Sequence, residues 1–176
     1  MSVTSGKGGV GKSHLAVNVA AVCAAGGKRV ALIDADGGLA NLDVLLGVQP
    51  QLHVGDLLDG ASLDEVLFEA RPNLALLPGA PGERRLAQLS DDDRRALQLA
   101  WTQVLERFDV VVVDVASGLS RDSLFFASAG EEPVLLVSDE PTSISDAAAV
   151  LQALQRDTSV SRVHVVVSAV RTTRSA

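Results

Sequence analysis

The sequence is poor in aromatic residues and in cysteine. Aromatic side chains make up 3% of the 176 residues, and tyrosine is absent. Few rings are therefore available to stack on the bases of single-stranded nucleic acid, and the formal net charge of -7 disfavours nucleic-acid binding driven by charge. The single cysteine, Cys23, permits no internal disulfide and no thiolate cluster, which excludes iron–sulfur and multi-cysteine zinc chemistry.

Long hydrophobic runs are also lacking. The first residues, MSVTSGKGG, reach glycine before an apolar leader segment could form, and no uninterrupted apolar stretch is long enough to span a bilayer. We therefore expect a cytoplasmic protein without a membrane helix. The composition, 47% hydrophobic and 21% charged, excludes wholesale disorder and predicts one domain over residues 1–176 with a core of Ala, Val and Leu.

Short apolar runs alternate with longer amphipathic segments, which predicts an α/β fold with a mostly parallel sheet and helices on both faces. Several runs are apolar throughout, as expected for strands that are covered on both sides. The predicted strands are Ser2–Thr4, Arg29–Ile33, Leu74–Leu77, Val110–Val113, Val134–Val137 and Val163–Val167.

Three helices and one loop are predicted from local signals. Ser13–Ala25 reads as a helix that ends at Gly26 and Gly27. Ser90 is predicted to cap a helix that runs to about Arg107, with Asp91, Asp92 and Asp93 in its solvated first turn; a metal cluster is the alternative for these aspartates. Ser143 and Asp146 form a capping-box pattern that predicts a helix toward Leu154, and Gly79–Arg85 reads as a loop.

The strongest functional signal is a phosphate-binding loop. Its residues, Gly6-Lys7-Gly8-Gly9-Val10-Gly11-Lys12-Ser13, fit the pattern GxxxxGK[ST] and lie between a predicted strand and a predicted helix. The glycines let the backbone curl so that several N–H groups point into one hollow, where the side chain of Lys12 would reach the β- and γ-phosphates. The hydroxyl of Ser13 would ligate Mg²⁺. All eight residues are predicted to bind the nucleotide; the alternative is a flexible glycine turn.

Lys7 distinguishes this loop from an ordinary one. The segment KGGVGKS, with a lysine at position 7, resembles the deviant Walker A motif of the MinD/ParA family of ATPases. The resemblance implies a three-layer P-loop NTPase domain, ATP or ADP with Mg²⁺ as cofactors, and a homodimer in the ATP state. In that dimer Lys7 would reach the nucleotide of the partner subunit and act, with Lys12, on the charge that develops during hydrolysis. The alternative is a solvated loop lysine.

Two segments that contain aspartates resemble the other nucleotide motifs of the family. The run Ala31–Gly47 resembles the first switch, and its portion GLANLDVLLG is close to the FleN/FlhG branch, the regulators of flagellar number. The resemblance implies that Asp36 positions the attacking water and that Asp34 supports the Mg²⁺ shell; alternatively, Asp34 only caps a turn. Asp114 ends an apolar strand as in a Walker B motif, which implies a contact with Mg²⁺.

The segment Val137–Asp146 resembles the DEPTSITDA stretch of the flagellar branch, so Glu140 and Asp146 are candidates for contacts at the dimer seam or with a protein partner. The alternative is a loop followed by a capped helix. Two positions depart from the family. Val115 follows Asp114 where a hydroxyl residue is usual, and Ser168 stands where relatives carry an asparagine that reads adenine.

The resemblance therefore implies a slow Mg²⁺-dependent ATPase that dimerises on ATP and regulates flagellar number. Its partner would be a protein such as a flagellar transcriptional activator or assembly protein, without strong nucleic-acid binding. The alternatives are a shortened, non-catalytic relative that serves as a protein-binding module, and a DNA-partitioning ATPase of the ParA type.

Overall fold

A computed structural model describes the chain except for residues 38–39, 81, 83–84, 86–87, 131 and 169–176. Its strands form a seven-stranded sheet in the order β3-β4-β2-β5-β1-β6-β7. Neighbouring strands are parallel, apart from the antiparallel pair of β3 and β4. The strands are β1 Ser2–Ser5, β2 Val30–Ala35, β3 Phe68–Arg71, β4 Leu74–Leu77, β5 Val110–Val115, β6 Val134–Ser138 and β7 His164–Ser168.

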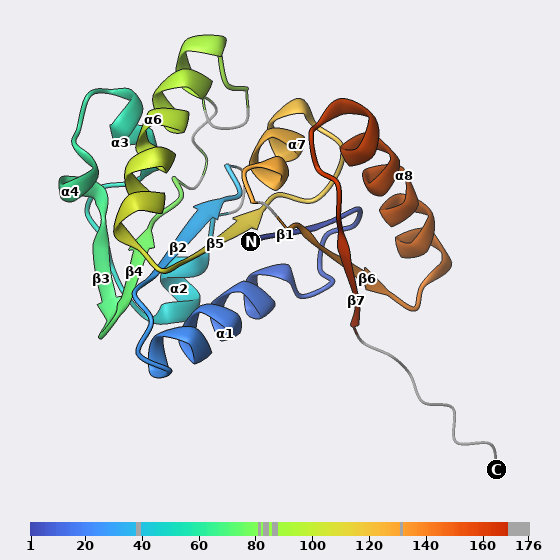
Figure 1. Ribbon diagram of the computed structural model, residues 1–176, viewed down its shortest axis with the longest axis horizontal. Coiled ribbons are helices and arrows are strands. Elements are labelled where there is room, and N and C mark those ends of the chain that lie inside the picture. Colours follow the sequence, from blue (N-terminus) through green and yellow to red (C-terminus); the bar gives the residue numbers. More distant parts are fainter. Residues whose placement is uncertain (38–39, 81, 83–84, 86–87, 131, 169–176) are drawn as a thin grey trace.

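Helices cover both faces of the sheet (Figure 1). They are α1 Lys12–Ala25, α2 Leu42–Leu46, α3 Val54–Leu58, α4 Leu63–Val66, α6 Asp91–Arg107, α7 Arg121–Ser128 and α8 Pro141–Asp157. Helices α1 and α2 lie against one face, and α6, α7 and α8 lie against the other. The predicted three-layer α/β fold is confirmed. In the part of the chain that is described, no helix combines the length and the apolar character that crossing a membrane requires.

Residues 30–33 of strand β2 are all apolar, and their burial shows why. Ala31 and Ile33 belong to the core cluster under α6, α7 and α8, whereas Val30 and Leu32 belong to the cluster under α1. Successive side chains point to opposite faces of a sheet, so a strand that is covered on both sides has no solvent-facing position. Burial of each large aliphatic side chain stabilises the fold by about 1.5–3 kcal/mol.

The six predicted strands are all present, and their ends differ from prediction by at most two residues. Strand β3 was not predicted. Its side chains alternate between exposed Glu69 and Arg71 and better-buried Phe68 and Ala70, the pattern of an edge strand with one wet face. Asn73, with φ of 64°, lies in the turn that reverses the chain between β3 and β4. The short helix α7 was not predicted either.

The helix caps agree with the sequence in one case and not in another. Ser90 caps α6 as predicted: its hydroxyl accepts from the N–H of Asp93 at 3.1 Å, and the Asp93 carboxylate accepts from the N–H of Ser90 at 2.9 Å. The predicted cap at Ser143 is wrong. Helix α8 begins at Pro141, because proline suits the first helical position, and the buried Ser143 hydroxyl accepts from the N–H of Ser138 at 2.9 Å.

The predicted loop over residues 79–85 lies partly outside the described residues. The three aspartates that follow Ser90 have arginine partners. Asp91 pairs with Arg94 and Arg121, Asp92 with Arg95, and Asp93 with Arg85. These ion pairs and the cap explain the three aspartates as residues of the first turn of α6, the interpretation that the sequence favoured over a metal cluster.

Candidate functional site

Residues 6–11 connect β1 to α1 at the carboxyl ends of the parallel strands, and Lys12 and Ser13 are the first residues of the helix. Gly9 and Gly11 have φ values of 77° and 99°, a left-handed conformation that side chains disfavour. Gly11 is the N-cap of α1, and its carbonyl accepts from the N–H of Leu15 at 3.0 Å. The loop therefore has the curled backbone and the helix N-terminus that binding of phosphates by backbone amides requires.

Neighbouring elements hold this loop from several sides. The Ser5 hydroxyl donates to the carbonyl of Lys7 at 2.7 Å, and the Ser168 hydroxyl donates to the carbonyl of Val10 at 2.8 Å. A Cβ added to Gly6 would lie 2.3 Å from the carbonyl carbon of Asp146, so the loop lies directly against α8. Asp146, a predicted partner contact, thus packs against the loop of its own chain.

The two lysines of the loop have different surroundings. Lys12 is 8% exposed and begins α1. Lys7 has a side chain that is 40% exposed; its ammonium forms an ion pair with Glu140 and lies 3.5 Å from the hydroxyl of Thr142. The lysine that the family resemblance assigns to a partner subunit is therefore paired within its own chain at the start of α8.

The predicted metal ligands converge from three elements. Asp34 of β2 and Asp114 of β5 are paired directly in the parallel register, and they are 3% and 2% exposed. The hydroxyl of Ser13 is hydrogen-bonded to the Asp114 carboxylate. The pKa of Asp114 is raised to about 6. Burial is the largest cause, the nearby charge of Asp34 adds to it, and the Ser13 hydrogen bond and the charge of Lys12 act in the opposite direction.

Asp114 has the surroundings expected of a Mg²⁺ ligand. Its Oδ1 atom is buried and has no hydrogen-bond partner among the described residues. A buried carboxylate oxygen without a donor is costly unless a cation neutralises it, and Mg²⁺ prefers carboxylate and hydroxyl oxygens. The oxygens of Asp114 and Ser13 thus fit Mg²⁺.

Asp34 differs from Asp114 in that its carboxylate has several donors. It accepts from the N–H groups of Asp36 at 3.2 Å, Asn41 at 2.9 Å and Leu42 at 3.0 Å. Burial nevertheless raises its pKa. Asp34 therefore caps the turn before α2, the alternative that the sequence left open, and its contribution to a Mg²⁺ shell stays a prediction.

Asp36 lies in the same turn, where its N–H is fixed by Asp34 and its side chain is half-buried. The first switch, Ala31–Gly47, includes residues 38–39, which lie outside the described residues. Gly79 is a site residue that sequence reasoning missed. A Cβ there would lie 2.9 Å from Cγ of Asp34 and 2.5 Å from Cβ of Ala40, so only glycine allows this close approach. A glycine two residues after an apolar strand was the available signal.

The two departures from the family pattern also have structural explanations. Val115 is fully buried and packs in the core cluster under α7, so its side chain points away from water. The hydroxyl of Ser168, besides its bond to Val10, lies 3.4 Å from the carbonyl of Val137.

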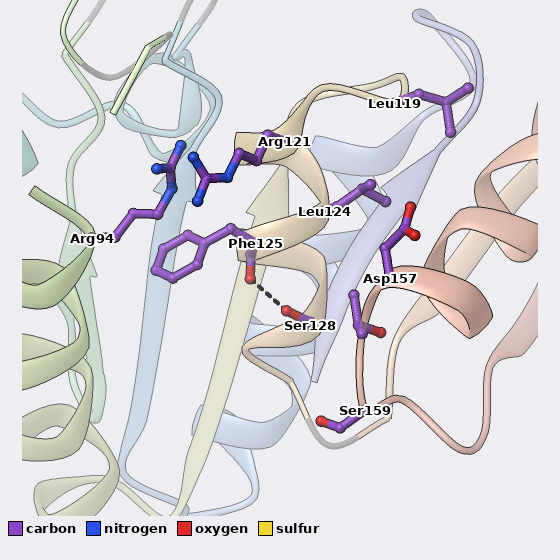
Figure 2. Close-up of a pocket in the computed structure, with 9 residues that line it drawn as sticks. Arg94, Leu119, Arg121, Leu124, Phe125, Ser128, Asp157 and Ser159 are labelled. Atoms are coloured by element: carbon purple, nitrogen blue, oxygen red, sulfur yellow. Dashed lines mark hydrogen bonds between the residues drawn. The ribbon is translucent and has the colours of Figure 1, made fainter. Parts of the chain in front are cut away.

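A separate groove of about 560 Å³ runs along α7 between α6 and α8 (Figure 2). Leu119, Leu124 and Phe125 line it, and the guanidinium groups of Arg94 and Arg121 lie at one end. Both arginines already have partners: Arg94 pairs with Asp122 at 2.5 Å, and both pair with Asp91. The charge of the groove is thus neutralised within the chain, and we assign it no ligand.

Known proteins resemble this chain in sequence and in fold. It is 41% identical over 166 residues to the antiactivator FleN of Pseudomonas aeruginosa, across 94% of this chain and 59% of FleN. It is 37% identical over 153 residues to the flagellum site-determining protein YlxH of Helicobacter pylori, across 86% of this chain and 52% of YlxH. A chain of the MinC:MinD cell division protein complex of Aquifex aeolicus has a TM-score of 0.82 and 29% identity, across 94% of this chain and 66% of that one.

These comparisons confirm the predicted resemblance to MinD, with FleN and YlxH among the similar proteins. The chain spans 59% of FleN and 52% of YlxH. Residues 1–176 match the family described as the CobQ/CobB/MinD/ParA nucleotide binding domain. The chain therefore belongs to the CobQ/CobB/MinD/ParA family of nucleotide-binding domains.

Proposed function

We propose that residues 1–176 act as one domain, an ATP-driven switch that binds and slowly hydrolyses ATP with Mg²⁺ and dimerises in the ATP state. One observation carries this proposal. The curled glycine loop ends in Ser13, whose hydroxyl meets the buried carboxylate of Asp114, and that carboxylate has an oxygen without a donor among the described residues. Such a pairing of a phosphate loop with an uncompensated carboxylate suits a nucleotide that arrives with a divalent cation.

The residues of the site would have distinct roles in nucleotide binding and hydrolysis. The backbone N–H groups of residues 6–13 would bind the phosphates, and Lys12 would neutralise the β- and γ-phosphates. Ser13 and Asp114 would hold Mg²⁺, which when bound supplies positive charge beside the phosphates. Asp36 would orient a water in line with the γ-phosphate, so that catalysis comes from positioning and from charge stabilisation.

Lys7 would complete the site of a second copy. At about 4 Å and an effective dielectric constant near 20, one ammonium stabilises a unit negative charge by about 4 kcal/mol. Its partner Glu140 has a side chain that is 51% exposed, so their ion pair is screened by water and opens at low cost. Release of Lys7 from Glu140 would allow it to reach a nucleotide across a dimer interface.

The biological role that we propose is control of flagellar number or assembly through a protein partner of the ATP-bound dimer. Similarity to FleN and to the flagellum site-determining protein YlxH supports this role. A flagellar transcriptional activator or assembly protein would recognise the surface that dimerisation creates.

Binding calorimetry, phosphate release and light scattering test the proposal on four proteins. We expect the wild type to bind Mg²⁺-ATP, to become a dimer and to hydrolyse ATP. Lys12→Ala removes the cation inside the loop and should abolish binding, whereas Asp36→Ala should bind and dimerise without turnover. Lys28→Ala, at an exposed lysine beyond α1, is the matched control and should behave as wild type. Equal ATP turnover by the wild type, Lys12→Ala and Asp36→Ala would overturn the assignment.

A further inference from the structure

The end of the edge strand β7 is hydrogen-bonded to the middle of the phosphate loop. The Ser168 hydroxyl donates to the carbonyl of Val10 at 2.8 Å, across a sequence separation of 158 residues. Ser168 is the last residue of β7 and pairs with Ser138 of β6. Residues 164–167 of the same strand are exposed, whereas Ser168 is half-buried, so the strand becomes covered where it meets the loop.

The Val10 carbonyl belongs to a peptide unit whose direction matters for anion binding. Val10 lies between Gly9 and Gly11, both with left-handed φ values, and the residue is 9% exposed. Because a trans peptide unit is planar, the carbonyl of Val10 and the N–H of Gly11 point in opposite directions. Holding that carbonyl toward β7 therefore aims the Gly11 N–H away from β7.

The Val10–Gly11 peptide unit is bounded by Val10 and Gly11, and the glycine restrains its rotation only weakly. Glycine adopts both signs of φ with similar ease, so the sequence Gly9-Val10-Gly11 does not by itself select one orientation. The loop has anchors at its beginning, where Ser5 donates to Lys7, and at its end, where Leu15 donates to Gly11. Between these two anchors, the Ser168 hydroxyl donates a hydrogen bond to the Val10 carbonyl and holds the middle of the loop.

We propose that Ser168 is a positioning residue for nucleotide binding: its hydroxyl fixes the Val10–Gly11 peptide so that the Gly11 N–H faces the polyphosphate before the nucleotide arrives. The loop is then preorganised, and binding does not have to order it. The inference rests on the proposed function for the identity of the anion. The fixing of the peptide itself is a property of the nucleotide-free protein.

Hydrogen exchange of the nucleotide-free protein, followed by NMR at the amides of residues 9–13, tests the fixing of the peptide. Ser168→Ala removes the hydroxyl, and Ser168→Val removes it while keeping a branched side chain. Ser168→Thr restores the donor with almost the same shape as valine. We expect exchange at Gly11 to be about threefold or more faster in the alanine and valine variants, and close to wild type in the threonine variant.

Ser128→Ala is the matched control, because its hydroxyl also donates to a backbone carbonyl, that of Phe125 at 2.9 Å, but on α7 (Figure 2). It should leave the loop amides unchanged. Calorimetry with Mg²⁺-ADP should give a dissociation constant about three to ten times higher for Ser168→Ala and Ser168→Val, and near wild type for Ser168→Thr and Ser128→Ala.

The proposal would be overturned if Gly11 exchanged at the wild-type rate in both Ser168→Ala and Ser168→Val. It would also be overturned if exchange were faster but the affinity for ADP were unchanged. Thermal unfolding of each variant separates a local effect from a loss of folding. If the wild type binds neither ADP nor ATP, the proposed function fails. The exchange comparison still decides whether Ser168 fixes the loop.

Discussion

Asp34 and Asp114 lie opposite each other in the parallel register of β2 and β5, yet their carboxylates are stabilised differently. Asp34 accepts three backbone N–H groups, whereas Asp114 is hydrogen-bonded to Ser13 and keeps an oxygen without a partner among the described residues. Of two buried carboxylates at the same level of the sheet, Asp114 is therefore the one whose negative charge the nucleotide-free fold leaves least compensated.

Replacement of Asp114 by asparagine should stabilise the nucleotide-free protein near neutral pH. Folding raises the pKa of Asp114 from 3.8 to about 6, so the folded chain holds the proton more tightly than the unfolded chain. The resulting stability is fully present below about pH 4 and is lost as the pH rises to about 6. At about pH 7, Asp114→Asn should raise the free energy of unfolding by up to about 3 kcal/mol.

Urea unfolding in the presence of a chelator, at a series of pH values, measures this effect. The difference between the variant and the wild type should grow as the pH rises through the window and then level off. Asp92→Asn, at a side chain that is 91% exposed, is the control and should give a flat difference. A difference that is flat for Asp114→Asn as well would contradict the assignment of an uncompensated charge.

The sequence predicted those features that depend on local pattern. The apolar strands around Ile33 and Val112 are recognisable because burial on both faces requires a continuous apolar run. The phosphate loop is recognisable because its glycines are needed for the backbone itself. Strand β3 was missed because its four residues alternate with charges and pair in the opposite direction, which a search for buried parallel strands does not detect.

The contacts between distant segments could not be predicted in the same way. Lys7 and Glu140 are separated by 133 positions, and neither carries a local sign that it meets the other. The close approach of Gly79 to Asp34 depends on how β4 and β2 end side by side. Ser143 matched a capping pattern, but Pro141 offers a better helix start, and the hydroxyl is used instead to hold β6.

Gly6→Ala tests the contact between the phosphate loop and α8. The added Cβ would lie 2.3 Å from the backbone of Asp146, so the loop and the helix must separate. Such overpacking costs about 1–3 kcal/mol of stability, and the displaced loop should bind nucleotide at least about tenfold more weakly. Chemical unfolding and calorimetry measure the two effects.

Gly26→Ala is the control for that variant. Gly26 has φ of -76°, and its added Cβ would lie 3.3 Å from the carbonyl oxygen of Cys23, so a small adjustment accommodates it. We expect a change in stability below about 1 kcal/mol and unchanged nucleotide binding. Similar effects at positions 6 and 26 would show that the close approach to α8 is unimportant.

The stability that the capping box of α6 contributes should decrease in acid. Hydrogen bonds from Arg85, and then from Ser90, lower the pKa of Asp93 to about 2 from 3.8. The stability that Asp93 contributes is present above about pH 4 and is lost as the pH falls through about 2. Asp93→Asn should therefore be less stable than wild type near neutral pH, and the difference should shrink in acid. Circular dichroism during pH titration measures it, and Ser90→Ala should cost about 1 kcal/mol at neutral pH.

Glu140→Gln tests whether the ion pair with Lys7 restrains dimerisation. The pair is exposed, so its loss should change the free energy of unfolding by less than about 1 kcal/mol. An amide holds an ammonium less strongly than a carboxylate does, so Lys7 should leave its own chain more readily. Light scattering should then show dimers of the variant at about one third of the ATP concentration that the wild type requires.

Thr142→Ala is the matched control, because it removes the weaker 3.5 Å contact of the same ammonium without changing any charge. It should shift the dimerisation midpoint less than Glu140→Gln does. Lys7→Ala and the double variant Lys7→Ala/Glu140→Gln complete a cycle in which the effect of the glutamine should vanish once Lys7 is absent. If Glu140→Gln instead prevents dimerisation while Lys7→Ala leaves it intact, the carboxylate contributes to the interface directly, and restraint of Lys7 is the wrong explanation for the pair.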